Sequence, residues 1–158
     1  MQKQIEQLAM TLVQRHWTLV TAESCTGGGV ACRLSAVTGS SAWLEGGFVT
    51  YSNAMKQQLL GVSAELLEQQ GAVSQACVEA MARGALAHSP AQLSVAISGI
   101  AGPGGGTEEK PVGTVWIAWA RVDGVLVSQR FDFSGDRQSV RDQAVENAIQ
   151  GFLAVLEE

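Results

Sequence analysis

Three consecutive glycines, Gly27 to Gly29, limit what this chain can fold into more than any other short segment. They follow Glu23-Ser24-Cys25-Thr26, which come directly after a short run of β-forming residues, 18–22. A helical-looking stretch, 30–37, begins immediately after them. The order of strand, tight loop and helix is typical of α/β domains, and the helix start in such a unit presents free backbone N–H groups. The segment therefore predicts a place where an oxyanion or a phosphate binds.

The glycine segment lacks the signatures of two common nucleotide-binding loops. The Gly-Lys-Ser/Thr ending of a Walker loop is missing, and the spacing is not the Gly-x-Gly-x-x-Gly of dinucleotide-binding folds. A turn that needs glycine, followed by a helix that needs a cap, explains the spacing equally well. The spacing alone leaves a binding loop and a structural turn open.

Apolar periodicity predicts helices on both sides of this unit. Near the N-terminus, Ile5, Leu8, Ala9, Leu12 and Val13 form one continuous apolar helix face. Further helices are expected over 54–60, capped by Ser52 or Asn53, over 74–87, and from about Asp136 onward.

Four further strands are expected, over 47–51, 93–97, 112–120 and 125–133. Asp123-Gly124 joins the last two as a two-residue hairpin turn, which makes this pair antiparallel. In the last strand apolar residues alternate with polar ones, which indicates one buried face. Crossover units followed by a hairpin predict an α/β fold: a single domain with a mixed β-sheet and helices packed against it.

The length and charge of the chain narrow the class of protein. At 158 residues it has the size of one globular domain, so we expect a single domain over 1–158. A net charge of −5 argues against nucleic acid as a partner and favours a small molecule. The N-terminal segment is too polar for a membrane span or a secretion signal, so we expect a soluble cytoplasmic protein with no membrane partner.

The cysteines and histidines predict neither a disulfide framework nor a metal site. Cys25, Cys32 and Cys77 are odd in number and lack the paired spacing of a zinc site. This fits a reducing cytoplasm, and we expect no metal and no cofactor. His16 and His88 stand at predicted helix ends and are expected to be ordinary surface residues, so a Ser-His-Asp triad is not expected.

Ser24 is the candidate nucleophile and Lys56 the candidate base. A serine hydroxyl is a weak nucleophile until a neighbouring base takes its proton. Lys56 falls in the first turn of the predicted helix 54–60, where the positive helix end and a partly apolar cleft both favour loss of its proton. A lysine in a first helical turn is more often solvated, and that alternative stays open.

Two neighbours of this pair have alternative roles. Tyr51, the only tyrosine, is expected at the end of strand 47–51. There its hydroxyl can orient Lys56 or relay a proton, or its ring can simply pack on the sheet. Cys25 follows Ser24, but adjacent side chains usually point in different directions, so we expect a buried structural thiol rather than a nucleophile.

Backbone donors and arginines complete the candidate site. The amides around Thr26, Gly27 and Gly28 are expected to hold an oxyanion. A second glycine-rich segment offers Ser98, Gly99, Gly102 and Gly104 to a phosphate or a substrate carbonyl, although such segments are also common as simple turns. Arg137 and Arg141, at the start of the last helix, can bind a phosphate, and Arg141 can equally pair with a neighbouring carboxylate.

Five motifs, in order along the chain, resemble the CinA C-terminal domain family. They are Thr21-Ala22-Glu23-Ser24-Cys25-Thr26-Gly27-Gly28, Val49-Thr50-Tyr51-Ser52-Asn53 with Lys56, Gly71-Ala72-Val73-Ser74, Gly99-Ile100-Ala101-Gly102-Pro103 and Lys110-Pro111-Val112-Gly113-Thr114-Val115. The resemblance covers nearly the whole chain. Ser98 stands where the family often has threonine, which keeps the hydroxyl. Because no additional domain precedes the first predicted helix, the chain is similar to the stand-alone form of the family.

The resemblance implies a nicotinamide-nucleotide amidase. Such an enzyme converts nicotinamide mononucleotide to nicotinate mononucleotide and ammonia, which recycles a by-product of NAD consumption. The resemblance also implies that Ser24 is the nucleophile and Lys56 the base, with Tyr51 close by. Family members are often oligomeric, so a homo-oligomer stays open.

Two alternative functions use the same loops. In the first, the chain is a non-catalytic nucleotide-binding module that regulates another enzyme. In the second, it is a different amidase or a phosphohydrolase, although the missing histidine base and metal ligands argue against most phosphohydrolases. Ammonia release from nicotinamide mononucleotide separates the amidase from the binding module.

Overall fold

Helices and strands alternate over most of the chain, and a hairpin followed by a long helix completes it. The computed structural model describes residues 1–158. The strands are β1 (Leu19–Glu23), β2 (Leu44–Val49), β3 (Leu93–Gly99), β4 (Thr114–Arg121) and β5 (Leu126–Asp132). The helices are α1 (Gln2–Arg15), α2 (Gly29–Ser35), α3 (Asn53–Leu60), α4 (Ala64–Gln70), α5 (Gln75–Ala87) and α6 (Arg137–Glu157), with a short 3₁₀ turn at Ser40–Ala42.

The strands form one five-stranded sheet in the order β2-β1-β3-β4-β5. β1 pairs in parallel with β2 and β3, whereas β4 is antiparallel to both β3 and β5. This arrangement confirms the predicted α/β fold with a mixed sheet. Because β1, β2 and β3 run the same way, they all end at one edge of the sheet, called here the carboxyl edge. The turn between β4 and β5 lies at the opposite edge, where Arg121 pairs with Leu93.

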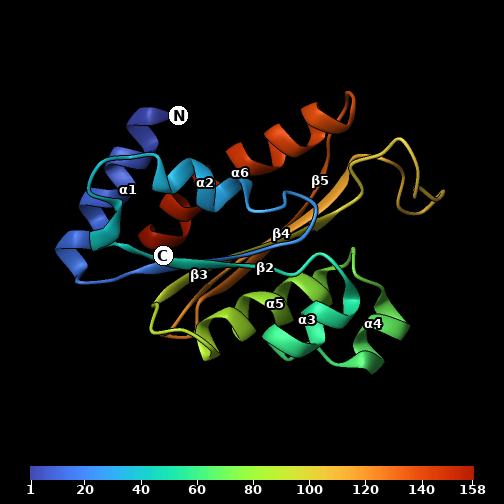
Figure 1. Cartoon of the computed structure of the whole chain (residues 1–158), viewed down its shortest axis with the longest axis horizontal. Coiled ribbons are helices and arrows are strands. Elements are labelled where there is room, and N and C mark those ends of the chain that lie inside the picture. Colours follow the sequence, from blue (N-terminus) through green and yellow to red (C-terminus); the bar gives the residue numbers. More distant parts are fainter.

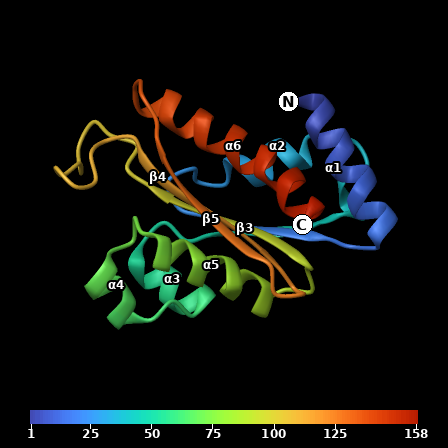
Figure 2. The ribbon, with the colours of Figure 1, turned by 180° about the vertical axis from the view of Figure 1, so that it is seen from behind.

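Helices cover both faces of the sheet (Figures 1 and 2). α1, α2 and α6 lie on one face, and α3, α4 and α5 lie on the other. The segment between β3 and β4 extends beyond the end of the sheet as a long loop. The fold is therefore a three-layer sandwich of helices, sheet and helices.

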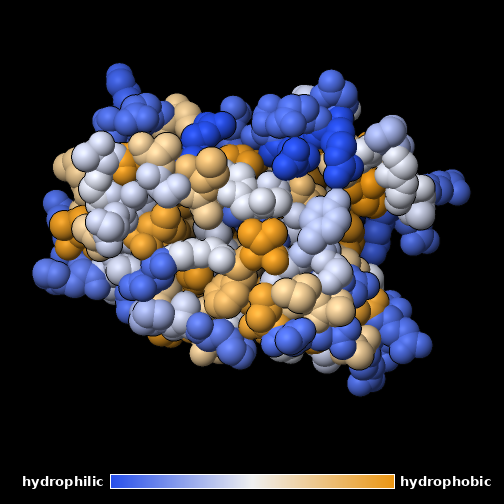
Figure 3. Space-filling view, viewed as in Figure 1, coloured by the Kyte–Doolittle hydropathy of each residue, from blue (hydrophilic) through white to orange (hydrophobic).

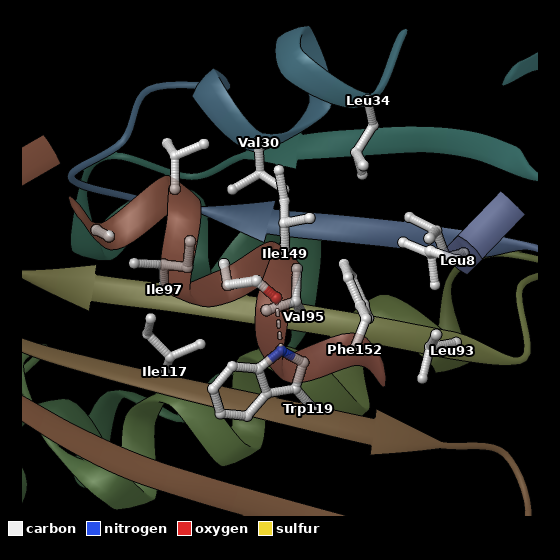
Figure 4. Packing of buried hydrophobic residues seen from close by; sticks show 14 of the residues in the cluster. Leu8, Val30, Leu34, Leu93, Val95, Ile97, Ile117, Trp119, Ile149 and Phe152 are labelled. Carbon is white, nitrogen blue, oxygen red and sulfur yellow. Dashed lines mark hydrogen bonds between the residues drawn. The ribbon is translucent and has the colours of Figure 1, made fainter. Parts of the chain in front are cut away.

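Large apolar side chains fill the layer under α1, α2 and α6 (Figure 4). This cluster contains 23 buried residues, among them Leu34 and Phe152. The indole Nε1 of Trp119 donates to the backbone oxygen of Ala148 at 2.9 Å, so the one polar atom of this ring is satisfied. A Cβ at Gly151 would lie 2.1 Å from Cζ2 of Trp119, so only glycine lets α6 lie directly on the indole.

Small side chains fill the layer on the other face. This cluster contains 14 buried residues, and half of them are alanine: Ala22, Ala82, Ala85, Ala91, Ala96, Ala118 and Ala120. In α5, a Cβ at Gly84 would lie 2.0 Å from the backbone oxygen of Leu60 at the end of α3. Small residues thus allow α5 to pack closely against the sheet and against α3.

Side-chain caps begin three of the predicted helices. Ser52 Oγ accepts from the amide of Met55 at 3.1 Å at the start of α3, so Ser52 rather than Asn53 is the cap. Ser74 caps α5 by accepting from the amide of Cys77 at 3.2 Å, and Asp136 caps α6. The predicted starts of these helices are therefore confirmed to within one residue.

One strand prediction and one turn prediction need correction. β2 covers Leu44–Val49 rather than 47–51, because the chain has to leave the sheet before Ser52 caps α3. The β4–β5 hairpin is antiparallel as predicted, but its turn is longer than two residues. Gly124 donates its amide to the backbone oxygen of Arg121 at 3.1 Å and alone adopts a positive φ, of 104°, in this turn. A bulged turn of this kind has one left-handed position instead of two.

Helix α4 was not predicted from the sequence. It has seven residues, and only Leu67 among them is buried. A single buried residue gives no apolar periodicity, although Ser63 does cap the helix by accepting from the amide of Leu66 at 3.1 Å.

The surface mixes polar and apolar residues. On the face drawn in Figure 3, hydrophobic patches lie across the middle and hydrophilic side chains gather along the upper rim. None of the helices is both long enough and apolar enough to span a bilayer.

Candidate active site

The carboxyl edge of the sheet carries an open cleft of about 280 Å³. Its lining residues are Ser24, Cys25, Tyr51, Asn53, Lys56, Ala72, Val73, Ser98, Gly99, Ile100, Ala101, Gly102, Gly104, Gly105 and Arg137. Ser24 follows β1, Tyr51 follows β2, and the second glycine-rich segment follows β3. Because these three strands are parallel neighbours, residues that are far apart in the sequence meet at their carboxyl ends, where ligands of α/β sheets commonly bind.

Ser24 and Lys56 are in direct hydrogen-bond contact. The Nζ atom of Lys56 lies 3.0 Å from Ser24 Oγ and donates to it. Nζ also donates to the backbone oxygen of Tyr51 at 2.9 Å, and Ser24 Oγ lies 3.3 Å from the same oxygen. Contact between a hydroxyl and a base, with the base held by a third group, is the arrangement that activates a serine.

Lys56 is buried, so the alternative of a solvated lysine is wrong. Its exposed fraction is 1%. Burial lowers the pKa of the Lys56 ammonium below its ordinary value, because the charged form loses its hydration. A larger fraction of the side chain is then the neutral amine, which can accept a proton from Ser24.

Tyr51 contributes its backbone carbonyl to Lys56 rather than its hydroxyl. It lies beyond the end of β2 and its side chain is 60% exposed, so neither the predicted strand end nor packing on the sheet is correct. The phenol oxygen accepts from Nη2 of Arg137 at 3.2 Å. Tyr51 therefore contacts Lys56 through its main chain and Arg137 through its side chain.

The thiol of Cys25 is buried, as expected. Its exposed fraction is 6%, and burial raises its pKa to about 11. The thiol is thus protonated at neutral pH, which makes it a poor nucleophile. Cys77 is also buried, and burial likewise raises its pKa to about 11.

The first glycine loop, residues 24–28, is fixed by hydrogen bonds within the chain. The amide of Gly27 donates to the backbone oxygen of Ser24 at 3.0 Å. In the first turn of α2 the amides of Val30 and Ala31 donate to the carboxylate of Glu23 at 2.8 and 3.1 Å. The expectation that the start of α2 presents free N–H groups is therefore wrong, because the buried carboxylate already occupies it.

Of the predicted oxyanion donors, none of Thr26, Gly27 and Gly28 lines the cleft. The amides of Thr26 and Gly28 donate to no other group of the chain, whereas that of Gly27 is already used. Gly27 and Gly28 have positive φ angles of 61° and 99°, so the loop requires glycine at both positions.

The second glycine loop, residues 100–106, is open. Gly102 and Gly104 of this loop line the cleft, together with Ser98 and Gly99 at the end of β3. The amides of residues 101, 102 and 104–106 donate to no other group of the chain. This loop therefore offers backbone donors that a ligand can use.

The two predicted arginines have different surroundings. Arg137 lines the cleft, where Nη1 donates to the backbone oxygen of Gly102 at 2.8 Å. Arg141 lies outside the lining and donates from Nε to the backbone oxygen of Cys25 at 3.1 Å and from Nη2 to that of Thr26 at 3.4 Å. Neither of the alternatives expected for Arg141, a phosphate in the cleft or a carboxylate on a solvated face, describes these contacts.

Neither histidine takes part in this site. His16 ends α1 in a left-handed conformation, and Nδ1 of His88 lies 2.8 Å from the backbone oxygen of Gly84 at the end of α5. No group of three or more His, Cys, Asp or Glu side chains is placed to hold a metal ion.

Glu23 is the residue of this region to which the sequence analysis assigned no role. It is completely buried at the end of β1, directly before Ser24. An acidic residue that ends an otherwise uncharged strand was the available signal, because a buried carboxylate needs several hydrogen-bond donors.

The sequence and the fold agree with one known family. Residues 1–156 match the model of the CinA C-terminal domain, and the chain belongs to this family. It is 55% identical over 145 residues to the nicotinamide-nucleotide amidohydrolase PncC of Escherichia coli (strain K12), which covers 92% of this chain and 88% of that protein. It is 58% identical over 136 residues to PncC of Pseudomonas putida, with 85% and 84% covered.

Solved structures have the same fold. The competence-damaged protein (CinA) superfamily protein of Klebsiella pneumoniae superposes with a TM-score of 0.92 at 42% identity, over 98% of this chain and 96% of that one. The competence/damage inducible protein CihA of Agrobacterium tumefaciens gives a TM-score of 0.90 at 41% identity, over 96% and 95% of the two chains.

Proposed function

We propose that this protein hydrolyses the carboxamide of nicotinamide mononucleotide to nicotinate mononucleotide and ammonia, with Ser24 as nucleophile and Lys56 as base. The observation that carries the proposal is the 3.0 Å contact between Ser24 Oγ and a buried lysine whose pKa is lowered by burial. Relatives that are 55% and 58% identical to most of this chain are named nicotinamide-nucleotide amidohydrolase, which supports the substrate.

In the first half of the reaction, neutral Lys56 takes the proton of Ser24 as Oγ attacks the carboxamide carbon. The tetrahedral intermediate carries its negative charge on the former carbonyl oxygen. Lys56 then gives its proton to the departing nitrogen, and ammonia leaves an acyl-enzyme on Ser24. The contact of Nζ with the backbone oxygen of Tyr51 keeps the amine aimed at Oγ in both steps.

In the second half, water replaces ammonia. Lys56 takes a proton from the water as its oxygen attacks the ester carbon, and then returns that proton to Ser24 Oγ. The ester bond breaks and nicotinate mononucleotide is released. One lysine thus acts as base and acid in turn, and every proton that it accepts is passed on.

Backbone amides are the proposed donors to the oxyanion. The candidates are the unpaired amides of Gly102 and Gly104 in the second glycine loop, because both residues line the cleft, whereas Thr26, Gly27 and Gly28 do not. Loss of one such donor typically costs about 10²–10³-fold in rate. The geometry of this loop is therefore expected to matter as much as the contact between Ser24 and Lys56.

Arg137 is the proposed contact for the phosphate. Lys56 and Arg137 are the only charged residues that line the cleft. The guanidinium has five N–H donors, and its two contacts, to Gly102 and Tyr51, leave others for phosphate oxygens. A substrate with its carboxamide at Ser24 and its phosphate at Arg137 would span the cleft.

The first test is ammonia release from nicotinamide mononucleotide by the purified protein, with and without a chelator. Ser24→Ala is expected to abolish turnover, whereas Cys25→Ser, the matched change at the neighbouring residue, is expected to keep it. A wild-type rate that the chelator does not change is the result expected for a metal-free serine amidase. Nucleotide binding without any turnover by the wild type contradicts the proposal and favours the regulatory binding module.

Two further expectations belong to the same proposal. We propose a cytoplasmic location, in keeping with the unpaired cysteines of the chain. A homo-oligomer remains compatible with the resemblance to the family, and sedimentation of the purified protein measures it directly.

A further inference from the structure

Glu23 is the only acidic residue among the buried side chains, with an exposed fraction of 0%. The two ion pairs of the protein, Arg121–Asp123 and Arg130–Asp132, do not involve it. A carboxylate in such a place is costly unless several donors replace its water. Glu23 directly precedes Ser24, so the energetic cost of burying its carboxylate points to a role beside the nucleophile.

Four donors surround the carboxylate of Glu23. Oε1 accepts from Thr26 Oγ1 at 2.6 Å and from the amide of Val30 at 2.8 Å. Oε2 accepts from Thr21 Oγ1 at 3.2 Å and from the amide of Ala31 at 3.1 Å. One side chain thus connects strand β1, the first glycine loop and the positive end of helix α2.

Arg141 binds the acceptor groups of the same loop, whereas Glu23 binds donor groups. Its guanidinium donates to the backbone oxygens of Cys25 and Thr26 at 3.1 and 3.4 Å. Glu23 accepts from one hydroxyl before Ser24 and from one hydroxyl and two amides after it, and Arg141 donates to the two carbonyls that follow Ser24. The loop is therefore fixed through both its donors and its acceptors.

We propose that Glu23 is a positioning residue that fixes Ser24 Oγ at the distance from Lys56 that proton transfer requires. This inference rests on the proposed function, because it concerns the same nucleophile. Glu23 is completely buried and does not line the cleft. It acts through the loop, where a shift of about 1 Å in a reacting group can cost about 10²-fold in rate.

Two substitutions at this position have different expected effects. Glu23→Ala removes all four acceptor contacts and is expected to lower kcat by about 10²-fold, the cost of a misplaced nucleophile, with KM unchanged. Glu23→Gln keeps the shape of the side chain and one acceptor oxygen. Its NH₂ group replaces the other oxygen, so that two N–H donors face each other at the amide of Ala31 or Val30. Its kcat is expected to lie between those of Glu23→Ala and the wild type.

The readout that separates positioning from a merely structural role is the reactivity of Ser24 itself. A small sulfonyl fluoride labels an activated serine without any nucleotide, and mass spectrometry gives the labelling rate per folded molecule. We expect slower labelling in Glu23→Ala and partial rescue in Glu23→Gln. Glu45→Ala, which removes an exposed carboxylate from β2, is the matched control and is expected to label at the wild-type rate.

The outcomes separate this inference from the proposed function. Slow labelling in the Glu23 variants supports positioning even if the wild type releases no ammonia from nicotinamide mononucleotide, a result that would contradict only the substrate. Folded Glu23→Ala that labels at the wild-type rate overturns the inference, even if its melting temperature falls. If Glu23→Ala does not fold, the labelling rates of Glu23→Gln and Thr26→Val test the inference instead. Thr26→Val removes a single contact of the carboxylate, and slower labelling than in the wild type supports positioning.

Discussion

The two glycine loops lie next to each other at the carboxyl edge, yet their polar groups are used in opposite ways. In the first loop, Glu23 accepts from the hydroxyl of Thr26, Arg141 donates to the backbone oxygens of Cys25 and Thr26, and most of the loop is buried. In the second loop, five amides have no partner in the chain, and residues 103–106 are exposed. Glycine content therefore does not distinguish a loop that fixes a nucleophile from a loop that offers donors to a ligand.

Lys56 of α3 contacts the nucleophile of the first loop, so the largest effect is expected at this lysine. Lys56→Ala is expected to lower kcat by about 10²–10⁴-fold, the usual contribution of a general base. Initial rates of ammonia release measure the loss, and circular dichroism checks that the variant is folded. If most of the activity remains in folded protein, the base lies elsewhere.

The same lysine predicts a pH dependence of stability. Its pKa is lower in the folded protein than the ordinary value of 10.5 that applies to the unfolded chain. Between these two values the unfolded chain binds more protons, so the free energy of unfolding rises with pH through this window. The full cost of burying the lysine applies below the folded-state pKa.

Lys56→Met is the matched variant, since methionine has no proton to lose. We expect the wild type to gain stability relative to Lys56→Met as the pH rises from neutral toward 10.5. Urea denaturation at several pH values measures the difference. A constant difference would mean that burial does not change the protonation of Lys56.

The second loop and Arg137 are expected to govern affinity rather than chemistry. Arg137→Gln is expected to raise KM about tenfold or more, because a hydrogen bond to a charged group contributes about 1.5–3 kcal/mol. The value of kcat should change little. Steady-state kinetics separates the two constants, and a fall in kcat with unchanged KM would place Arg137 in the chemical step instead.

The fixed loop should tolerate a methyl group poorly. Gly28 has a φ of 99°, a conformation that costs an L-residue about 1–2 kcal/mol. Gly28→Ala is expected to lower the free energy of unfolding by about that amount, as measured by urea denaturation. An unchanged value would show that the first loop is less constrained than its hydrogen bonds indicate.

The open loop provides the smallest expected effect and the control for Gly28→Ala. A Cβ at Gly104 would have no neighbour within 4 Å, and the residue does not have a positive φ. Gly104→Ala is therefore expected to change the free energy of unfolding by less than about 0.5 kcal/mol, as for other surface positions. A cost similar to that of Gly28→Ala would remove the distinction between the loops.

Much of the fold follows from short-range patterns in the sequence. The apolar stripe of α1 indicates that helix correctly, and the predicted starts near Ser52, Ser74 and Asp136 lie within one residue of the observed ones, because caps and periodicity are local. The hairpin was also predicted, although not its turn. Helix α4 was missed because a seven-residue helix with one buried side chain has no apolar face to detect.

The candidate site was predicted less completely, because burial and pairing are long-range properties. The sequence indicated Ser24 and Lys56, but not that Lys56 is buried or that the Tyr51 carbonyl contacts it. The contacts of Arg141 with the first loop depend on how α6 packs beside that loop, and no local pattern encodes this. For Glu23, the sequence shows a charge in a strand, and only the fold shows which donors surround it.

The β4–β5 turn lies at the edge of the sheet opposite the carboxyl edge, which makes it useful for attaching labels to the protein. Val122 in this turn is 61% exposed, and β4 runs its whole length between the turn and the cleft. Exposed loop tips tolerate insertion best. A reporter peptide or a fluorophore attached in this turn would lie on the same sheet as the cleft but would not obstruct the opening of the cleft. The turn is therefore a suitable attachment point for immobilisation or single-molecule work.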